Sequence, residues 1–279
     1  MNAKLQGEAA SIPSGPSAAA KPWLKSYPAG VPELINPTQY ASVVDLIDES
    51  CARFAEKGAF TSMGRTITFA DYERLSREFA AYLQNVAGLK KGDRVAVMMP
   101  NVLQYPIALY GALRAGLTVV NTNPLYTARE LEHQLTDSGA RAIVILENFA
   151  CTLEQVIDKT KLEHVIVTGV GDQLHWPKSI VANLVVRHVR KQVPSWNLPN
   201  AIRFNKALQL GRYSTFTPVP TTHEDVAFLQ YTGGTTGVAK GAMLTHRNMV
   251  ANVLQSESWI GTAAKVGQDT IITALPLYH

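Results

Sequence analysis

The sequence predicts an α/β fold, in which mixed or parallel strands form sheets with flanking helices. Between residues 94 and 168, short apolar runs typical of buried strands alternate with stretches of helical periodicity, which indicates a parallel sheet with helices on its faces. Gly116 and Gly139 stand where two of these helices should end. With 46% hydrophobic and 17% charged residues, the 279-residue chain can also bury a large core.

The segments before the alternation predict two helices and a strand. Residues 41–57 have apolar positions at helical spacing, which favours an amphipathic helix against the core. Residues 66–69 are typical of a short strand. Thr68, followed three residues later by Asp71, resembles a capping box that opens a helix over 72–86.

The alternation itself then accounts for the next part of the chain. In order, we expect strand 94–99, helix 102–114, strand 117–120, helix 128–136, strand 142–146, helix 152–159 and strand 164–168. The pattern breaks over 169–222, where five prolines predict an irregular insertion or connection. The first 20 residues, rich in Ala, Ser, Gly and Pro, are typical of a flexible leader.

Composition excludes several classes of protein. The formal net charge of +4 comes from scattered residues, so nothing indicates nucleic acid as a partner. Cys51 and Cys151 lie far apart without a CxxC pair, which argues against a disulfide scaffold or a zinc site and favours the cytoplasm. The uncharged run 95–113 contains prolines and amides, so a strand, turn and buried helix explain it better than a membrane span.

One helix in the irregular region has two readings. Residues 179–193 place apolar and basic side chains on opposite sides of a helix. The apolar side contains Val181, Leu184, Val185 and Val189, and the polar side Asn183, Arg187, Arg190 and Lys191. Such a helix can rest on an anionic membrane surface, or it can simply pack on its own domain.

The most informative segment is a loop rich in glycine and threonine. The apolar run 225–230 predicts a buried strand, which leads into residues 231–241 with four glycines and three threonines. Glycines let the backbone approach an anion closely, threonine hydroxyls donate to phosphate oxygens, and Lys240 adds a positive charge. A plain hairpin turn needs neither the threonines nor the lysine. A Walker A loop is also disfavoured, because Lys240 precedes Gly241 and a strand-like run comes before the helix that Thr245 should cap.

The run YTGGTTGVAKGAMLTHRNM, from Tyr231 to Met249, resembles the signature phosphate loop of the acyl-adenylate-forming superfamily, which includes acyl-CoA synthetases, firefly luciferases and adenylation domains of peptide synthetases. Further runs resemble bacterial long-chain fatty acyl-CoA ligases: KPWLKSYPAGVPELINP, LKKGDRVAVMMPN, NTNPLYTARELEHQLTDSGA and the terminal TALPLYH. The resemblance covers nearly everything after residue 20. It implies that ATP and a fatty acid form an acyl-adenylate and pyrophosphate, that coenzyme A then takes the acyl group, and that magnesium accompanies the ATP.

The resemblance also implies roles for individual residues. The expected ATP phosphate-binding residues are Tyr231, Thr232, Gly233, Gly234, Thr235, Thr236, Gly237, Val238, Ala239, Lys240, Gly241 and Ala242. Lys240 would neutralise charge as pyrophosphate departs. His279, the last residue of a second family motif, would orient the acid, although a terminal histidine can also be no more than a chain end. His246 is expected to begin a helix and not to act in catalysis.

The chain departs from the family pattern in its length. Family members continue for about as long again, and neither a Y-G-x-T-E nor a T-G-D sequence occurs here. We therefore expect residues 21–279 to form an incomplete N-terminal AMP-binding domain, without the C-terminal domain or the metal ligands, and inactive alone. Alternatives are a ligase for a medium-chain or aryl acid, a non-catalytic nucleotide- or lipid-binding module, and a basic protein of membrane surfaces or nucleic acid. The expected location is the cytoplasm, with peripheral contact at the inner face of the membrane as a further expectation.

Overall fold

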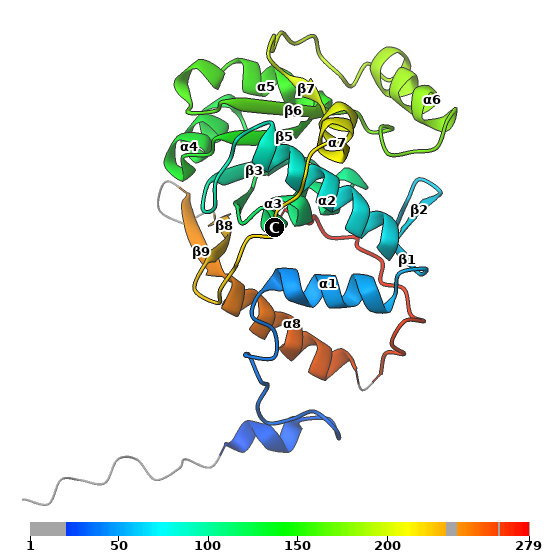
Figure 1. Ribbon diagram of the computed structural model, residues 1–279, viewed down its shortest axis with the longest axis vertical. Coiled ribbons are helices and arrows are strands. Elements are labelled where there is room, and N and C mark those ends of the chain that lie inside the picture. The colour runs from blue at the N-terminus through cyan, green and yellow to red at the C-terminus, as the bar shows by residue number, and fades with distance from the viewer. Residues whose placement is uncertain (1–20, 233–238, 262, 279) are drawn as a thin grey trace, which may run out of the picture.

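The computed structural model describes residues 21–232, 239–261 and 263–278, and it shows a central sheet with helices on both faces (Figure 1). The sheet has seven strands in the order β7-β6-β5-β3-β4-β8-β9. They are β3 (Arg94–Met98), β4 (Thr118–Asn121), β5 (Ala142–Leu146), β6 (His164–Thr168), β7 (Ile202–Arg203), β8 (Val226–Thr232) and β9 (Lys240–Thr245). A second sheet pairs β1 (Gly58–Ser62) with β2 (Arg65–Thr68). The expected leader, residues 1–20, lies outside the described residues.

Helices fill most of the connections. They are α1 (Val43–Arg53), α2 (Phe69–Asn85), α3 (Gln104–Arg114), α4 (Ala128–Ser138), α5 (Ala150–Glu154), α6 (Lys178–Leu184), α7 (Phe204–Arg212) and α8 (His246–Ile260). Short 3-10 turns form η1 (Pro22–Ser26), η2 (Glu147–Phe149) and η3 (Ile157–Lys159), and a π-helical turn forms η4 (Val185–Val189). The α/β fold class predicted from the sequence is confirmed.

The direction of the strands explains where the helices lie. The strands from β7 to β8 in the spatial order are parallel, and β9 runs antiparallel to β8. Crossovers between parallel strands are right-handed, so connections that move along the sheet in opposite directions place their helices on opposite faces. Accordingly, α3 and α7 cover one face together with α2, whereas α4 and α5 cover the other.

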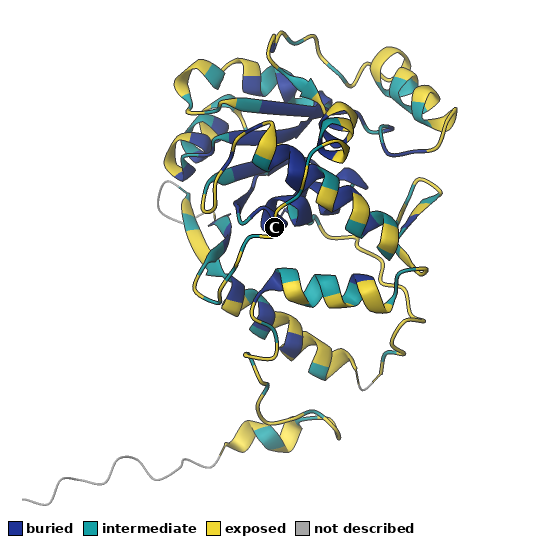
Figure 2. Ribbon diagram, viewed as in Figure 1, coloured by how far each residue is buried: buried dark blue, intermediate teal, exposed yellow. Residues whose placement is uncertain are grey.

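Two apolar cores result, one on each face of the sheet. In β3, Val95 and Val97 belong to the core beneath α2, α3 and α7, whereas Ala96 and Met98 belong to the core beneath α4 and α5. All four side chains are fully buried, and the dark blue centre of Figure 2 follows the sheet. Burial on both faces is why these strands appear in the sequence as continuous apolar runs.

Several element boundaries predicted from the sequence are confirmed. β5 and β6 have the predicted limits, and both hydrogen bonds of the Thr68–Asp71 capping box open α2. Gly139 ends α4 with a φ of 60°, as the glycine position indicated. The predicted helix 152–159 is instead two short pieces, α5 and η3.

The stretch 169–222 is more regular than the sequence analysis expects. Besides α6 and η4, it contains the edge strand β7 and the helix α7. Phe204 of α7 is fully buried, and its ring centre lies 5.1 Å from that of Phe79 in α2. The prolines at 199 and 218 flank α7 without entering it, so they limit the helix and do not prevent it.

A histidine joins the N-terminal helix α1 to α8. His246 is 2% exposed, and its Nδ1 accepts a hydrogen bond from the Val43 amide at 3.2 Å. Since Nδ1 is the acceptor, the neutral ring carries its proton on Nε2. Burial lowers the pKa of His246 to about 4, although the nearby Asp225 and Asp45 oppose this shift. As expected from the sequence, His246 begins a helix.

We predict that acid weakens this junction. The folded pKa of about 4 lies below the ordinary value of 6.5, so His246 contributes stability above pH 6.5 that is lost as the pH falls towards 4. The free energy of unfolding should therefore drop between pH 7.5 and 5.0, and the drop should be smaller in His246→Asn, whose amide oxygen can still accept from Val43. Denaturant titrations at both pH values measure this. His188→Asn, which alters an exposed histidine, is the control. If the free energy of unfolding of His246→Asn drops as much as that of the unaltered protein, the prediction is contradicted.

Candidate functional site

The glycine- and threonine-rich segment connects two antiparallel strands. β8 and β9 pair so that Tyr231 lies opposite Gly241 and Thr232 lies opposite Lys240. The expected phosphate-binding residues Gly233 to Val238 lie outside the described residues, so the structure places the two ends of the connection. Thr245 then caps α8 through a capping box with Asn248. The segment thus leads into a strand and then a helix, which supports the distinction from a Walker A loop.

Tyr231 anchors the first end of this connection. Its side chain is buried in the core beneath α4, and its hydroxyl donates to Asp137 Oδ2 of α4 at 2.5 Å. Burial, and next the Asp137 carboxylate, raise the pKa of the Tyr231 phenol, so the group stays neutral and can donate. The Tyr231 ring therefore points away from any ligand on the opposite face, and its role in the expected phosphate site is to position the strand.

The same helix holds the second end. His133 Nε2 of α4 donates to the Ala239 carbonyl at 3.0 Å. His133 and Asp137 are one helical turn apart and hence lie on one side of α4. The two residues fix the chain just before and just after the part that the structure leaves undescribed.

Gly241 completes this anchor by its small size. A Cβ atom built on Gly241 would lie 2.9 Å from the Tyr231 ring, closer than side chains normally approach. The Tyr231 ring occupies the space that a side chain at 241 would need. This explains Gly241 through packing, in addition to any contact of its backbone with a ligand.

Thr232 and Lys240 lie on the other face of the hairpin. Side chains alternate along a strand, so Gln230 and Thr232 share the face opposite to Tyr231, and Lys240 shares it as the partner of Thr232. Both Thr232 and Lys240 are exposed, as is Ala242. Among the described residues, none forms an ion pair with Lys240.

The last described residues run across the carboxyl ends of the parallel strands. Asn101, which follows β3, donates from Nδ2 to the carbonyls of Thr273 and Leu275 at 3.0 and 2.8 Å. Its Oδ1 accepts from the Leu277 amide at 2.9 Å. A single asparagine side chain thus satisfies three backbone groups of this segment and fixes its path.

Three further polar side chains connect this segment to the sheet and to α3 through hydrogen bonds. The Asn121 amide at the end of β4 donates to Gln230 Oε1 at 2.9 Å, and Gln230 in turn donates to the Tyr278 carbonyl at 3.0 Å. The Tyr105 hydroxyl lies 2.8 Å from Asn121 Oδ1 and 2.7 Å from the Leu277 carbonyl oxygen. This network attaches the end of the described chain to β4, β8 and α3.

The sequence analysis did not identify this network, which consists of Asn101, Tyr105, Asn121 and Gln230. The sequence did contain a signal for it, because an asparagine or glutamine ends or follows each of the apolar runs that form β3, β4 and β8. His279 lies outside the described residues, but its neighbour Tyr278 is buried and lies on the same face of the sheet as Thr232 and Lys240. The motif that contains His279 and the glycine-rich hairpin therefore meet at one edge, where open α/β sheets bind their ligands.

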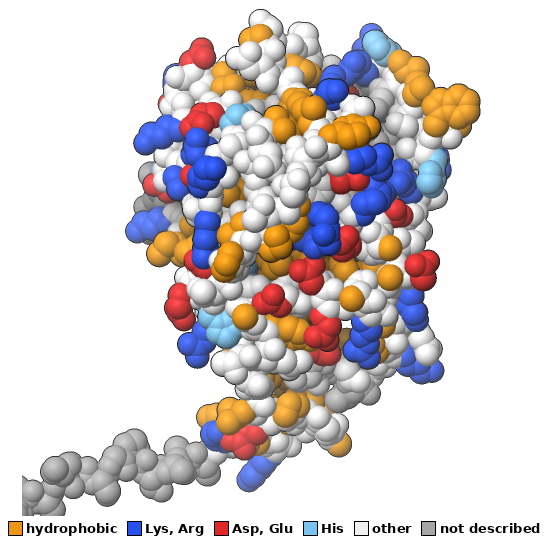
Figure 3. Space-filling view, viewed as in Figure 1, with side chains coloured by type: hydrophobic (Ala, Val, Ile, Leu, Met, Phe, Trp, Pro, Cys, Tyr) orange, Lys and Arg blue, Asp and Glu red, His pale blue; other side chains and the backbone are white. Residues whose placement is uncertain are grey.

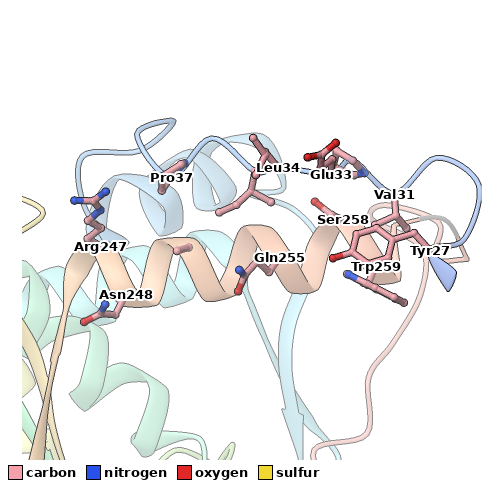
Figure 4. A pocket seen from close by; sticks show the side chains of 13 residues that line it. Tyr27, Val31, Glu33, Leu34, Pro37, Arg247, Asn248, Gln255, Ser258 and Trp259 are labelled. Carbon is pink, nitrogen blue, oxygen red and sulfur yellow. The ribbon is translucent and has the colours of Figure 1, made fainter. Parts of the chain in front are cut away.

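A cavity elsewhere does not contribute to this site. It has a volume of about 530 Å³ and lies between the N-terminal segment and α8, as Figure 4 shows. Its lining includes Tyr27 and Trp259, whose ring centres are 5.1 Å apart, and Arg247 at the start of α8. Because α8 begins where β9 ends, the full length of β9 separates Arg247 from the connection. In the described part of the chain, no group of three His, Cys, Asp or Glu side chains could hold a metal ion.

Comparison with known proteins gives a consistent result. The family model described as "AMP-binding enzyme" matches residues 47–279. The chain is 58% identical over 259 residues to a long-chain-fatty-acid–CoA ligase of Escherichia coli, which covers 93% of this chain and 46% of the relative. A ligase of the same description from Bacillus subtilis is 36% identical, with the same coverage. The chain thus spans about half the length of the curated relatives it matches.

Solved structures give the same fold. A long-chain-fatty-acid-CoA ligase from Archaeoglobus fulgidus superposes with a TM-score of 0.70 at 31% identity, covering 91% of this chain and 45% of that one. An anthranilate CoA ligase with bound anthranoyl-AMP superposes with a TM-score of 0.62 at 20% identity, covering 76% and 37%. At that identity the second likeness concerns the fold alone.

The packing of Gly241 against Tyr231 is open to a direct test. Gly241→Val should force the Tyr231 ring away from Asp137, because the new side chain would lie within 3 Å of that ring. We expect a loss of stability of about 1–3 kcal/mol, typical of overpacking. Thermal or denaturant unfolding measures it. Ala242→Val, on the exposed neighbour in β9, is the matched control, and an equal effect of the two substitutions would refute the packing role.

Proposed function

The chain belongs to the AMP-binding enzyme family, and we propose that it supplies the phosphate-binding part of a long-chain fatty acid–CoA ligase. The observation that carries this proposal is the hairpin whose two ends are anchored on α4 and whose exposed Thr232 and Lys240 lie at the carboxyl edge of the sheet. The high identity to ligases of that description supports the choice of reaction.

The reaction places two demands on such a site. A fatty acid carboxylate oxygen attacks the α-phosphorus of ATP, the bond to the β-phosphate oxygen breaks, and acyl-AMP and pyrophosphate form. The thiol of coenzyme A then attacks the acyl carbonyl and releases AMP. The first step requires the triphosphate to be held in place and the charge on the departing pyrophosphate to be neutralised.

The residues of the hairpin suit these demands. Thr232 and the backbone of residues 233–237 would hold the β- and γ-phosphates, and the exposed Lys240 ammonium would approach the departing pyrophosphate. Tyr231 would act indirectly, by fixing β8 against α4. Magnesium would accompany the ATP, where it would offset the negative charge of the phosphates.

The second motif would position the acid. The side chains of Asn101, Tyr105 and Gln230 form hydrogen bonds with the backbone of Leu277 and Tyr278, the residues that precede His279. We propose that His279 orients the carboxylate near the α-phosphate.

A long-chain acid is the preferred substrate for a comparative reason. The relatives named as long-chain ligases are 58% and 36% identical to this chain, whereas the anthranilate ligase is 20% identical. A ligase for a medium-chain or aryl acid remains the alternative. We propose coenzyme A and the fatty acid as substrates of the whole enzyme. This chain spans 46% of the length of its Escherichia coli relative.

The test is fatty-acid-dependent release of pyrophosphate by a chimera, in which residues 1–279 replace the matching part of the Escherichia coli relative. We expect release with long-chain acids, and Lys240→Ala should slow it by about 100-fold, as loss of a charge-stabilising group does. Gly234→Val should weaken ATP binding, because a side chain would obstruct the approach of the phosphates. Lys161→Ala, on an exposed lysine elsewhere, is the control. A folded chimera that releases no pyrophosphate with long, medium or aryl acids would overturn the proposal.

A further inference from the structure

The segment that follows α8 returns to the sheet with its apolar side chains exposed. In Figure 1 it is the red trace that runs from the end of α8 back towards α3. Ile271, Ile272 and Leu275 are 77%, 88% and 80% exposed, and hydrophobic side chains reach the surface where this segment runs, as Figure 3 shows. Burial of apolar side chains therefore does not fix the path of residues 271–275.

Backbone pairing does not fix this path either. Among the described residues, the single backbone-to-backbone hydrogen bond of residues 271–277 joins the Ala274 amide to the Ile272 carbonyl, within the segment itself. None of residues 271–277 belongs to a strand or a helix. Side chains from elsewhere in the chain therefore hold this segment through hydrogen bonds, and Asn101 forms three of them.

Asn101 is well placed to hold a backbone segment. It lies in the short turn between β3 and α3, and the residues two positions to either side, Met99 and Leu103, are buried. Its amide can point in one direction only, because the two carbonyls that it contacts need Nδ2 as a donor and the Leu277 amide needs Oδ1 as an acceptor. Both the backbone and the side chain of Asn101 are thus fixed.

The other two contacts to this segment are less specific to it. The Tyr105 hydroxyl has one proton but two acceptors within reach, Asn121 Oδ1 and the Leu277 carbonyl oxygen. Gln230 lies in β8, so a change there would also disturb the glycine-rich hairpin. In the described part of the chain, Asn101 forms no hydrogen bond with β8 or β9. A substitution of Asn101 therefore loosens the terminal segment and leaves the hairpin in place.

We propose that Asn101 is a positioning residue for the acid, and that it acts through the backbone of residues 273–277. This inference rests on the proposed function, in which His279 orients the carboxylate. Leu277, the last residue that Asn101 holds, is two residues before His279 in the sequence. A displacement of about 1 Å in a positioned group can cost about 100-fold in rate, so a residue that acts only through the backbone can control the chemical step.

The test uses the chimera described above, with pyrophosphate release measured as a function of the acid concentration. Asn101→Ala should lower kcat/KM for the long-chain acid by about 10- to 100-fold. It should leave the dissociation constant of ATP unchanged, because the hairpin keeps both of its anchors on α4.

Asn101→Asp is a second variant that creates no cavity. It keeps the size of the side chain and the acceptor for the Leu277 amide, but it places a carboxylate against the Thr273 and Leu275 carbonyl oxygens. Repulsion replaces the two donated hydrogen bonds, so kcat/KM for the acid should fall as it does in Asn101→Ala, again without a change in ATP binding.

Asn85→Ala is the matched control. Asn85 also donates from Nδ2 to the carbonyl of a distant residue, Thr215, at 2.9 Å. It is the last residue of α2, which leads to the amino end of β3 and hence to the opposite edge of the sheet. Asn85→Ala should keep the kcat/KM of the unaltered chimera, even if its unfolding temperature falls as much as that of Asn101→Ala.

A double-mutant cycle distinguishes positioning from a general loss of stability. If Asn101 acts through the segment that positions His279, Asn101→Ala should have little further effect in a His279→Ala background. Additive effects of these two substitutions would overturn the proposal. So would an Asn101→Ala effect no larger than that of Asn85→Ala, or a loss of ATP binding that accounts for the lower rate.

The unaltered chimera separates this inference from the proposed function. If the folded chimera releases no pyrophosphate with any acid, the proposed function fails and the role of Asn101 fails with it. If the unaltered chimera is active and both Asn101 variants match it, the role of Asn101 alone is refuted.

Discussion

The pairing of β8 with β4 is the contact on which the candidate site depends. It joins Asn121 to Gln230 and sets β8 parallel to the neighbouring strands, so its carboxyl end points to the same edge as theirs. This pairing places the described residues of the hairpin on β8 and β9, and the hydrogen bond from Gln230 to the Tyr278 carbonyl attaches the terminal segment to β8. A sheet with this register brings the glycine-rich hairpin and the segment 273–278 to the same edge.

The helix α4 gives this arrangement its rigidity. It packs beneath the sheet through Leu131 and Leu135, and from the same few turns it contacts both ends of the hairpin through His133 and Asp137. Glycine loses more conformational freedom than other residues when it is fixed, and four of residues 231–241 are glycines. Anchoring both ends on a packed helix reduces that cost for ligand binding, because fewer conformations remain to be excluded.

Local signals made much of the fold predictable. The limits of β5 and β6 follow from apolar runs, and the start of α2 follows from Thr68 and Asp71, all of which lie within a few residues of each other. The burial of Phe204 depends instead on Phe79 of α2, which is distant in the sequence, so the sequence analysis left α7 inside an irregular stretch. The candidate site divides in the same way. Its glycine, threonine and lysine pattern is readable in the sequence, whereas the anchoring of Tyr231 by α4 appears only when the chain is folded.

The sequence distance between β4 and β8 has a consequence for the order of folding. Asn121 and Gln230 are 109 residues apart, whereas β3, β4, β5 and β6 follow one another at short intervals. Closing a long loop costs entropy before the contact returns any energy, so local pairs form more readily. During synthesis, the core around β3 to β6 can therefore assemble while β8 is still inside the ribosome. The edge formed by β8 and β9 is then the last part of this sheet to be completed, and it is built on a scaffold that is already formed.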